Sequence, residues 1–349
     1  MTKTLRVLVV VPEGPGGDRD GAWNLALNVA RGVARTDPTG VHLTLLAPHG
    51  ERWPDTTAGV EIIMLEPDVR GRASSDAAAW GIAALVGSHD VIHIYDPQTR
   101  WGECALLAAG VWARPVCVTE RGQTDCLLGS RAGSLLTADA VISPTEDGRS
   151  LLGDLHPAEV IPGGVDLEVF QPPAPGGARD AVVCLPSIGG DAEFDRLRRG
   201  CPAGIQLVML ADAERSRPVI LGASVVEGSS AEAAASWYRR AIAVVPSLPR
   251  DPERFRSPGT TALGLLEGMA CAAPAVTGRA GPWAEHIGEG KTGYVVEDDS
   301  ELRDRLSALA GSAELVARLG AAGRRECAER WSMEMAGSRL ARLYRRLAG

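Results

Sequence analysis

The sequence predicts an α/β protein made of two doubly wound domains in series. Three observations lead to this prediction. Short runs of Val, Ile and Leu alternate with longer stretches rich in Ala, Leu and Arg, as the strands of a buried parallel sheet alternate with helices. The 349 residues are too many for one ordinary core and fit two domains. A stretch crowded with Pro, Gly and Ala, residues 171–180, divides the chain near its middle.

The first half predicts a sheet with helices between its strands. Its apolar runs are continuous rather than alternating, which is typical of strands buried on both faces. The predicted strands are residues 6–11, 42–47, 90–95, 115–119 and 138–144, and the predicted helices are residues 22–34 and 104–113.

The second half repeats this pattern after the linker and ends in helices. Its predicted strands are residues 181–186, 205–211, 217–225, 241–247, 273–278 and 293–298. We place the domains at residues 1–170 and 178–331, with a last helix, 332–349, joining the first domain. Leu340, Leu343, Tyr344 and Leu347 recur at helical spacing and form one apolar stripe that needs a partner surface.

Charge and composition exclude several classes of function. The net charge of −8 argues against nucleic acid or anionic lipid as a partner. No run approaches the roughly 18 apolar residues of a membrane span, and the first residues lack the features of a secretory signal. The seven cysteines include no CxxC pair, so we expect reduced thiols, no zinc site and a cytoplasmic protein.

Two loops at the predicted carboxyl edges of the sheets could bind a ligand. The first, residues 12–23, is rich in glycine, and Gly21 directly precedes a helix, where backbone N–H groups could approach a phosphate. The loop does not spell GxGxxG, so a dinucleotide fingerprint is poorly supported. A plain turn that needs a positive φ is the alternative.

The second loop leads into the predicted helix that contains Glu267. Thr260 or Thr261 could cap this helix, whose first N–H groups and partial positive charge suit a diphosphate. Arg254 and Arg256 lie just upstream and could add full positive charge, although an arginine-rich loop is often only a solvated face.

Glu267 is a lone carboxylate on an otherwise apolar helix. Such a group costs free energy unless it is paired, and sugar hydroxyls are suitable donors. A structural ion pair with an arginine is the alternative interpretation.

Three residues at strand ends are candidates for the catalytic edge of the first domain. His93 follows a predicted strand and is expected to point toward the cleft edge, with Asp96 close by, and Glu120 and Arg121 lie at the end of another strand. A histidine at this place is often a satisfied structural group rather than a base.

Several motifs resemble one enzyme family. The segments "VVPSL", "LGLLEGMACAAPAV", "EHIGEGKTGYVVEDD" and "IPGGVDLEVFQP" are similar in order and spacing to those of the retaining glycosyltransferases of family 4, which have the GT-B fold. "ADAVISPTEDGRSLL" and "DGAWNLALNVARGVA" match more loosely. The matches extend over nearly the full chain, and those between residues 245 and 299 are specific.

This resemblance implies two Rossmann-like domains that face a central cleft. The C-terminal domain would hold a nucleotide diphosphate sugar and the N-terminal domain an acceptor. Glu267 would accept hydrogen bonds from the ribose, and Gly21 would face the diphosphate from the other domain. A front-face route with retention would need neither a protein nucleophile nor a metal or other cofactor. The residues that would present amides to the diphosphate are Gly259, Thr260, Thr261, Ala262 and Leu263.

Three positions depart from the family pattern. Gly259 stands where a glutamate usually contacts the donor sugar, Ser187 about where an arginine is usual, and Arg121 where a histidine is common. Either the site is inactive or regulatory, or its charges have moved. The connection after "VVPSL" is longer than usual and carries Arg250, Arg254 and Arg256, so our hypothesis is relocation.

The sequence therefore predicts a bacterial glycosyltransferase that moves a sugar from a nucleotide diphosphate donor to a small soluble acceptor. We expect retention and a role in natural-product (antibiotic) biosynthesis. A catalytically impaired binding protein that supports a partner transferase and a nucleotide-sugar epimerase are the alternatives. No nucleic acid partner or stable membrane insertion is expected, and a homodimer stays open.

Overall fold

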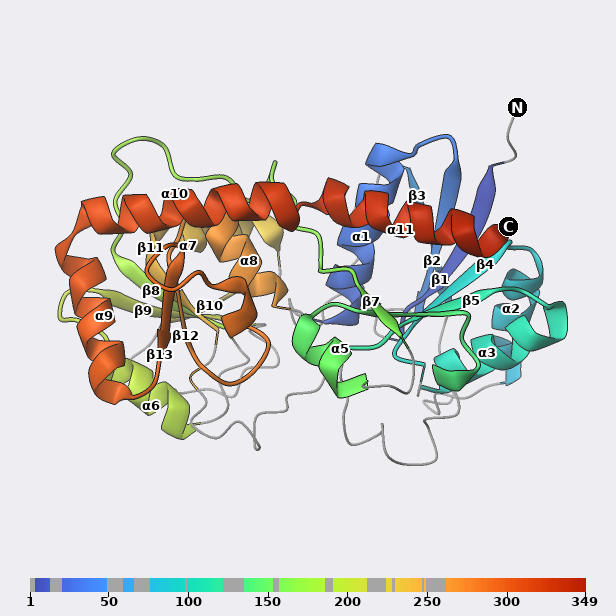
Figure 1. The fold of residues 1–349 in the computed structure, drawn as a ribbon, viewed down its shortest axis with the longest axis horizontal. Coiled ribbons are helices and arrows are strands. Elements are labelled where there is room, and N and C mark those ends of the chain that lie inside the picture. Colours follow the sequence, from blue (N-terminus) through green and yellow to red (C-terminus); the bar gives the residue numbers. More distant parts are fainter. Residues whose placement is uncertain are drawn as a thin grey trace. The chain divides into compact units, whose positions relative to one another are not determined.

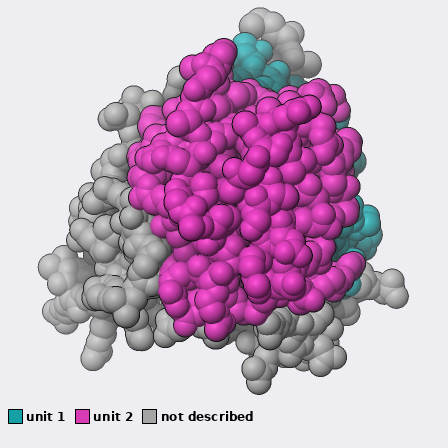
Figure 2. All heavy atoms as spheres, turned by 90° about the vertical axis from the view of Figure 1, so that its left-hand side faces the viewer, with its two compact units in different colours: residues 1–164, 333–349 teal, residues 165–332 magenta. Residues whose placement is uncertain are grey.

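The computed structural model divides the chain into two compact units. Unit 1 comprises residues 1–164 and 333–349, and unit 2 comprises residues 165–332 (Figure 2). The exposed Pro/Gly/Ala-rich stretch 171–180 lies within unit 2 rather than between the units. The structure describes residues 4–12, 21–48, 59–65, 76–97, 99–121, 135–152, 157–185, 191–211, 224–227, 230–246, 248 and 262–349.

Unit 1 contains a parallel sheet in the strand order β3-β2-β1-β4-β5-β6-β7 (Figure 1). The order reverses direction between β1 and β4, which makes this pair the topological switch point. Its strands are β1 Leu5–Val10, β2 Val41–Pro48, β3 Val60–Leu65, β4 Val91–Tyr95, β5 Val116–Thr119, β6 Ala140–Ser143 and β7 Ala158–Val160. Its helices are α1 Ala22–Thr36, α2 Asp76–Gly87, α3 Arg100–Trp112, α5 Glu146–Leu152 and α11 Met333–Ala348.

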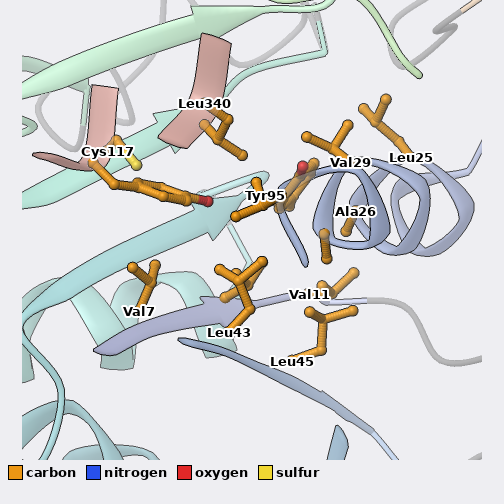
Figure 3. Packing of buried hydrophobic residues seen from close by; sticks show 14 of the residues in the cluster. Val7, Val11, Leu25, Ala26, Val29, Leu43, Leu45, Tyr95, Cys117 and Leu340 are labelled. Atoms are coloured by element: carbon orange, nitrogen blue, oxygen red, sulfur yellow. The ribbon is translucent and has the colours of Figure 1, made fainter. Parts of the chain in front are cut away.

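Helices cover both faces of this sheet. The core on one face joins side chains of β1 and β2 to those of α1 and α11, and the core on the other face joins the sheet to α2 and α3. Figure 3 shows Leu340 of α11, and Leu25 and Val29 of α1, among the buried residues of the first face. The five predicted strands and two predicted helices of this half are confirmed, while β3, β7, α2 and α5 were not predicted.

The stripe on the last helix packs as predicted. Leu340, Leu343 and Tyr344 are buried, and Leu347 packs against the same core. Glycines allow α11 to cross α1 closely. A Cβ placed on Gly337 would overlap the backbone of Gly32, and one placed on Gly32 would overlap the carbonyl of Met333. The partner surface of the last helix is therefore α1.

Unit 2 contains a second parallel sheet, in the order β10-β9-β8-β11-β12-β13, with its switch point between β8 and β11. Its strands are β8 Ala181–Cys184, β9 Gln206–Ala211, β10 Ser224–Glu227, β11 Ala241–Val245, β12 Ala275–Gly278 and β13 Gly293–Val296. Its helices are α6 Asp191–Gly200, α7 Ala231–Arg240, α8 Leu263–Ala270, the 3-10 turn η3 Ala284–His286, α9 Asp299–Gly311 and α10 Ala313–Arg330.

The helices of unit 2 also cover both faces of their sheet. Side chains of α7 and α8 pack on one face, and side chains of α6 and α9 pack on the other. Five of the predicted strands are found, and most of the sixth prediction, residues 217–225, lies outside the described residues. No helix in the described part of the chain has the length and apolar character needed to cross a bilayer.

Candidate active site

The helix α8 begins beside the switch point of unit 2. Two of its glycines allow it to pack close to the sheet. A Cβ on Gly264 would lie 2.9 Å from Cδ1 of Leu185, and a Cβ on Gly268 would lie 2.5 Å from Cγ2 of Val244. Leu185 follows β8 and Val244 belongs to β11, so the glycines let the helix pack tightly on the two strands that flank the switch point.

The residue that precedes this helix adopts an unusual backbone conformation. Ala262 is the N-cap, with φ 54° and ψ 14°, and its methyl side chain provides no cap for α8. An alanine in the left-handed region costs about 1–2 kcal/mol, and such strain collects at ligand sites. The predicted threonine cap is therefore wrong in position, because α8 starts at Leu263 and Ala262 precedes it.

Glu267 lies in the interior of α8 and is fully buried. All eight residues of this helix are buried, and the other seven are apolar residues or glycines, as the sequence predicted. Of the other predicted donor-binding residues, Ala262 and Leu263 lie at the helix start. Ser187, Arg254, Arg256, Gly259, Thr260 and Thr261 lie outside the described residues.

Two residues of α6 hold the chain just after β11. The Glu193 carboxylate accepts a hydrogen bond from the N–H of Leu248, and Nη1 of Arg196 donates to the Leu248 carbonyl at 2.6 Å. Nε of Arg196 also donates to Asp299 at 2.5 Å. Both polar backbone groups of Leu248 are thus bound by α6, which fixes the chain at the carboxyl edge of the sheet.

This clamp, in which Glu193 and Arg196 of α6 bind the backbone of Leu248, was not predicted from the sequence. Glu193 and Arg196 stand at i, i+3 on a polar helix, a pattern that usually indicates a solvent-exposed ion pair. The sequence offered one weak indication that this segment packs against another element. Leu248 is an apolar residue just after Pro246 at the end of a strand, and it is buried in the structure. Only the tertiary structure brings these segments together.

The switch point of unit 1 carries a buried ion pair. Asp96 follows β4 with φ 48°, and Arg121 follows β5. The Arg121 guanidinium donates to Asp96 through Nε, at 3.2 and 3.0 Å from the two carboxylate oxygens, and through Nη2 at 2.5 Å. The side chains are only 4% and 3% exposed. Glu120 beside them is also buried, and its N–H donates to the Ile142 carbonyl.

This pairing limits the chemistry open to Arg121. A guanidinium stays charged in proteins and does not accept a proton, so Arg121 cannot act as a general base. It can supply fixed positive charge, and Asp96 holds its planar fork in one orientation.

His93 lies inside the sheet core rather than at the edge of a cleft. Its ring is fully buried, with Nδ1 2.7 Å from the Tyr344 hydroxyl and Nε2 2.7 Å from the Thr119 hydroxyl. Burial lowers the pKa of His93 to about 3, so the ring is neutral at physiological pH. The expected direction of this side chain is therefore corrected: it ties β4 to α11, which agrees with the structural alternative.

Gly21 lies where the sequence placed it, directly before α1. It is the N-cap of this helix, with φ −70° and no side-chain cap. Its backbone is extended, so Gly21 itself needs no positive φ, and residues 13–20 of the loop lie outside the described residues.

A comparison with known protein families matches the part of unit 2 that contains α8 and the switch point. Residues 182–312 match the sequence model of the family described as glycosyl transferases group 1. This range runs from β8 to the residue after α9, and so includes the switch point of unit 2 and the start of α8.

Several solved structures cover nearly the whole chain. The crystal structure of Anabaena Alr3699/HepE, in complex with UDP and glucose, superposes with a TM-score of 0.74 over 98% of this chain and 100% of that one, at 11% identity. The chain has the GT-B fold. At this identity the likeness establishes the fold alone.

Two curated mycobacterial proteins are similar in sequence to this GT-B chain. A GDP-mannose-dependent α-(1-6)-phosphatidylinositol monomannoside mannosyltransferase of Mycolicibacterium smegmatis is 26% identical over 56% of the chain. An MMP α-(1→4)-mannosyltransferase of Mycolicibacterium hassiacum is 26% identical over 75% of the chain. The matches span 58% and 66% of the length of these two relatives.

Proposed function

We propose that this protein is a glycosyltransferase that uses a nucleotide diphosphate sugar. The match of residues 182–312 to group 1 glycosyltransferases carries the proposal, because it covers the segment in which α8 meets the switch point. Unit 2 is proposed to bind the donor and unit 1 the acceptor.

The start of α8 is proposed as the diphosphate site. Ala262 and Leu263 lie at a helix N-terminus, and such an end favours a negative charge. Arg254 and Arg256 are proposed to add positive charge here, in place of the basic residues that this chain lacks at its other motif positions. Glu267 is proposed to accept hydrogen bonds from the ribose.

The proposed transfer proceeds with retention. The acceptor atom bonds to the anomeric carbon as the bond from that carbon to the phosphate oxygen breaks. The acceptor proton passes to the departing phosphate oxygen, on the same face of the sugar. This route suits a site in which Arg121 cannot take up a proton and His93 is buried with both ring nitrogens occupied. No metal is proposed to take part, so EDTA should leave the rate unchanged.

The test is incubation of the full chain with GDP-mannose, UDP-glucose and other nucleotide sugars. Slow release of nucleoside diphosphate, faster with a correct acceptor, supports transfer, and the anomeric configuration of the product by NMR tests retention. Tight binding without turnover would favour an impaired binding protein. Recovery of an epimerised donor would favour the epimerase alternative.

The acceptor is proposed to be a small soluble molecule of natural-product biosynthesis. The net charge of −8 supports this choice over an anionic lipid, and the apolar face of the arginine-rich helix α11 is covered by α1. An acceptor panel should include both soluble alcohols and thiols and a phosphatidylinositol mannoside, since one relative is named for such a lipid acceptor. Transfer only to the lipid would overturn this choice without affecting the donor site.

Alanine variants test the relocated charges. Arg254→Ala and Arg256→Ala together should weaken donor binding at least tenfold, because each arginine would bind phosphate through charge-assisted hydrogen bonds. Arg198→Ala, which removes an exposed arginine of α6, is the matched control. Unchanged donor affinity in the double variant would refute the relocation.

A further inference from the structure

Large apolar side chains gather on the outside of α2 and α3. Among the described residues, five large apolar side chains are exposed, and four belong to these two helices, which pack side by side (Figure 1). Trp80 of α2 is 76% exposed, and Leu107, Val111 and Trp112 of α3 are 75%, 82% and 53% exposed. Single exposed apolar residues are normal, but a contiguous patch usually marks an interface.

The exposed face of α3 can pair with a copy of itself. Glu103, Leu107, Gly110 and Val111 follow one another at spacings of four, three and one, so they share one side of the helix. A Cβ placed on Gly110 would meet nothing within 4 Å, so this position faces open space between Leu107 and Val111. We propose that this patch, Trp80, Leu107, Val111 and Trp112, is the interface of a homodimer in which two α3 helices pack antiparallel about a two-fold axis near Gly110.

Charges at the ends of α3 fit this arrangement. Glu103 lies in the first turn, and within the described part of the chain no interaction of its carboxylate is found. Arg114 follows the helix and donates to the Gly87 carbonyl at 2.8 Å, with no carboxylate partner among the described residues. They lie about 16 Å apart along the helix axis. Antiparallel pairing about an axis near Gly110 places each within about 5 Å, measured along the helix axis, of its opposite charge in the second copy, because an isologous interface matches i to j and j to i.

The exposed area agrees with a dimer interface. The four side chains expose on the order of 500 Å² of apolar surface. A stable interface buries about 800 Å² on each partner, and about 65% of this area is apolar in homodimers. The patch therefore supplies about the apolar area that such an interface needs.

A membrane surface fits the patch less well than a second copy. From Trp80 to Arg114 the sequence contains two arginines, Arg100 and Arg114, and no lysine, and the side chain of Arg100 lies outside the described part. Helices that lie on membranes combine their apolar face with several lysines or arginines. The proposal does not depend on the donor or acceptor proposed above.

The test is sedimentation velocity of the full chain at micromolar concentrations. The wild-type protein should sediment as a dimer, and Leu107→Glu/Val111→Glu should sediment as a monomer with an unchanged thermal midpoint. The matched control is Ala313→Glu/Ala317→Glu, which adds two charges at the same spacing on the exposed side of α10 and should leave the dimer intact. A monomeric wild type, or a dimer that survives the α3 substitutions, would overturn the proposal.

Disulfide cross-linking independently tests the position of the two-fold axis near Gly110. Gly110→Cys should form a disulfide-linked dimer when a mild oxidant is added, whereas Ala317→Cys should not. A further assay is flotation with neutral lipid vesicles. If a monomeric wild-type protein floats with the vesicles and the Leu107→Glu/Val111→Glu variant does not, the patch binds a membrane and the dimer proposal is overturned.

Discussion

Arg121 and Asp96 place two opposite charges in the interior at the switch point of unit 1. Their side chains are almost completely buried, and each gives the other a charged partner in a place from which water is excluded. Asp96 also adopts a positive φ, which adds local strain at this point. The pair is therefore a rigid and costly feature of the edge that is proposed to receive the acceptor.

Removing one partner of this pair should be strongly destabilising. Arg121→Ala should lower the free energy of unfolding by about 3–5 kcal/mol, because it removes a buried charged partner of the Asp96 carboxylate. The measurement is urea denaturation at neutral pH. The double variant Arg121→Ala/Asp96→Ala should lose less than the sum of the two single losses. Strictly additive losses would show that the two side chains do not stabilise each other.

Buried histidines should make stability fall in mild acid. Burial lowers the pKa of His93, and that of His286 in unit 2, to about 3, while an unfolded histidine titrates near 6.5. Between these values the unfolded chain binds a proton that the native ring does not. The free energy of unfolding should therefore decrease as pH falls below about 6.5, by at most about 1.4 kcal/mol per pH unit for each histidine.

The measurement is urea denaturation at a series of pH values from 8 to about 4. His93→Gln should reduce the pH dependence, because its side chain does not titrate in this range. His42→Gln, at an exposed position paired with Glu61, is the control on the same unit. A pH slope that His93→Gln leaves unaltered would contradict this assignment.

At the residue scale, the sequence predicted where the candidate site residues lie in the fold better than it predicted the contacts of their side chains. Glu267, Arg121 and Gly21 stand where the pattern of strands and helices placed them. The side-chain direction of His93 was wrong, since a residue near a strand end can point into the core as readily as toward the edge. The Arg121–Asp96 pair was not predicted, because an ion pair 25 residues apart depends on which strands are neighbours.

Glycines at helix crossings decide how closely α1 and α11 approach. Gly337→Ala should lower the free energy of unfolding of unit 1 by about 1–3 kcal/mol, because the added methyl group would overlap the backbone of Gly32. Thermal or urea denaturation followed by circular dichroism measures the loss. Gly311→Ala, at a helix glycine with nothing within 4 Å of a Cβ, is the control and should be neutral. Equal stability of the two variants would mean that the helices can separate without cost.

The clamp between α6 and Leu248 should matter for donor binding. Glu193→Ala leaves the Leu248 N–H without its carboxylate and frees the chain after β11. The dissociation constant of the donor should rise about tenfold, which calorimetry with the nucleotide can measure. Asp195→Ala, on the exposed side of α6, should leave donor affinity unchanged. An effect of Glu193→Ala on stability alone, with wild-type affinity, would assign the clamp a purely structural role.

At the scale of elements most of the fold followed from periodicity. Continuous apolar runs marked the central strands correctly, because these strands are buried on both faces. In unit 1 the edge strands β3 and β7 and the helices α2 and α5 were missed, and β7 and α5 are only three and seven residues long. Four of the six residues of β3 are partly buried and one is exposed, which weakens the pattern, and α2 is apolar around most of its circumference and therefore shows little helical periodicity.

The whole molecule consists of one continuous unit and one discontinuous unit. The two cores of unit 2 contain only residues between 165 and 332, whereas one core of unit 1 includes Leu340 and Tyr344. A fragment of residues 165–332 should therefore fold on its own, with a cooperative urea transition. A chain ending at residue 332 should keep that transition and lose the one from unit 1. Failure of the isolated fragment to fold would show that the units depend on each other.

The return of α11 to unit 1 also affects how the chain folds as it leaves the ribosome. Unit 2 has all its residues once Ser332 has emerged, but the His93–Tyr344 hydrogen bond can form only after the last residues are synthesised. Unit 1, although it is translated first, is therefore completed last. During that interval the surface of α1 that α11 will cover is exposed, and it is there that a chaperone would bind the nascent protein.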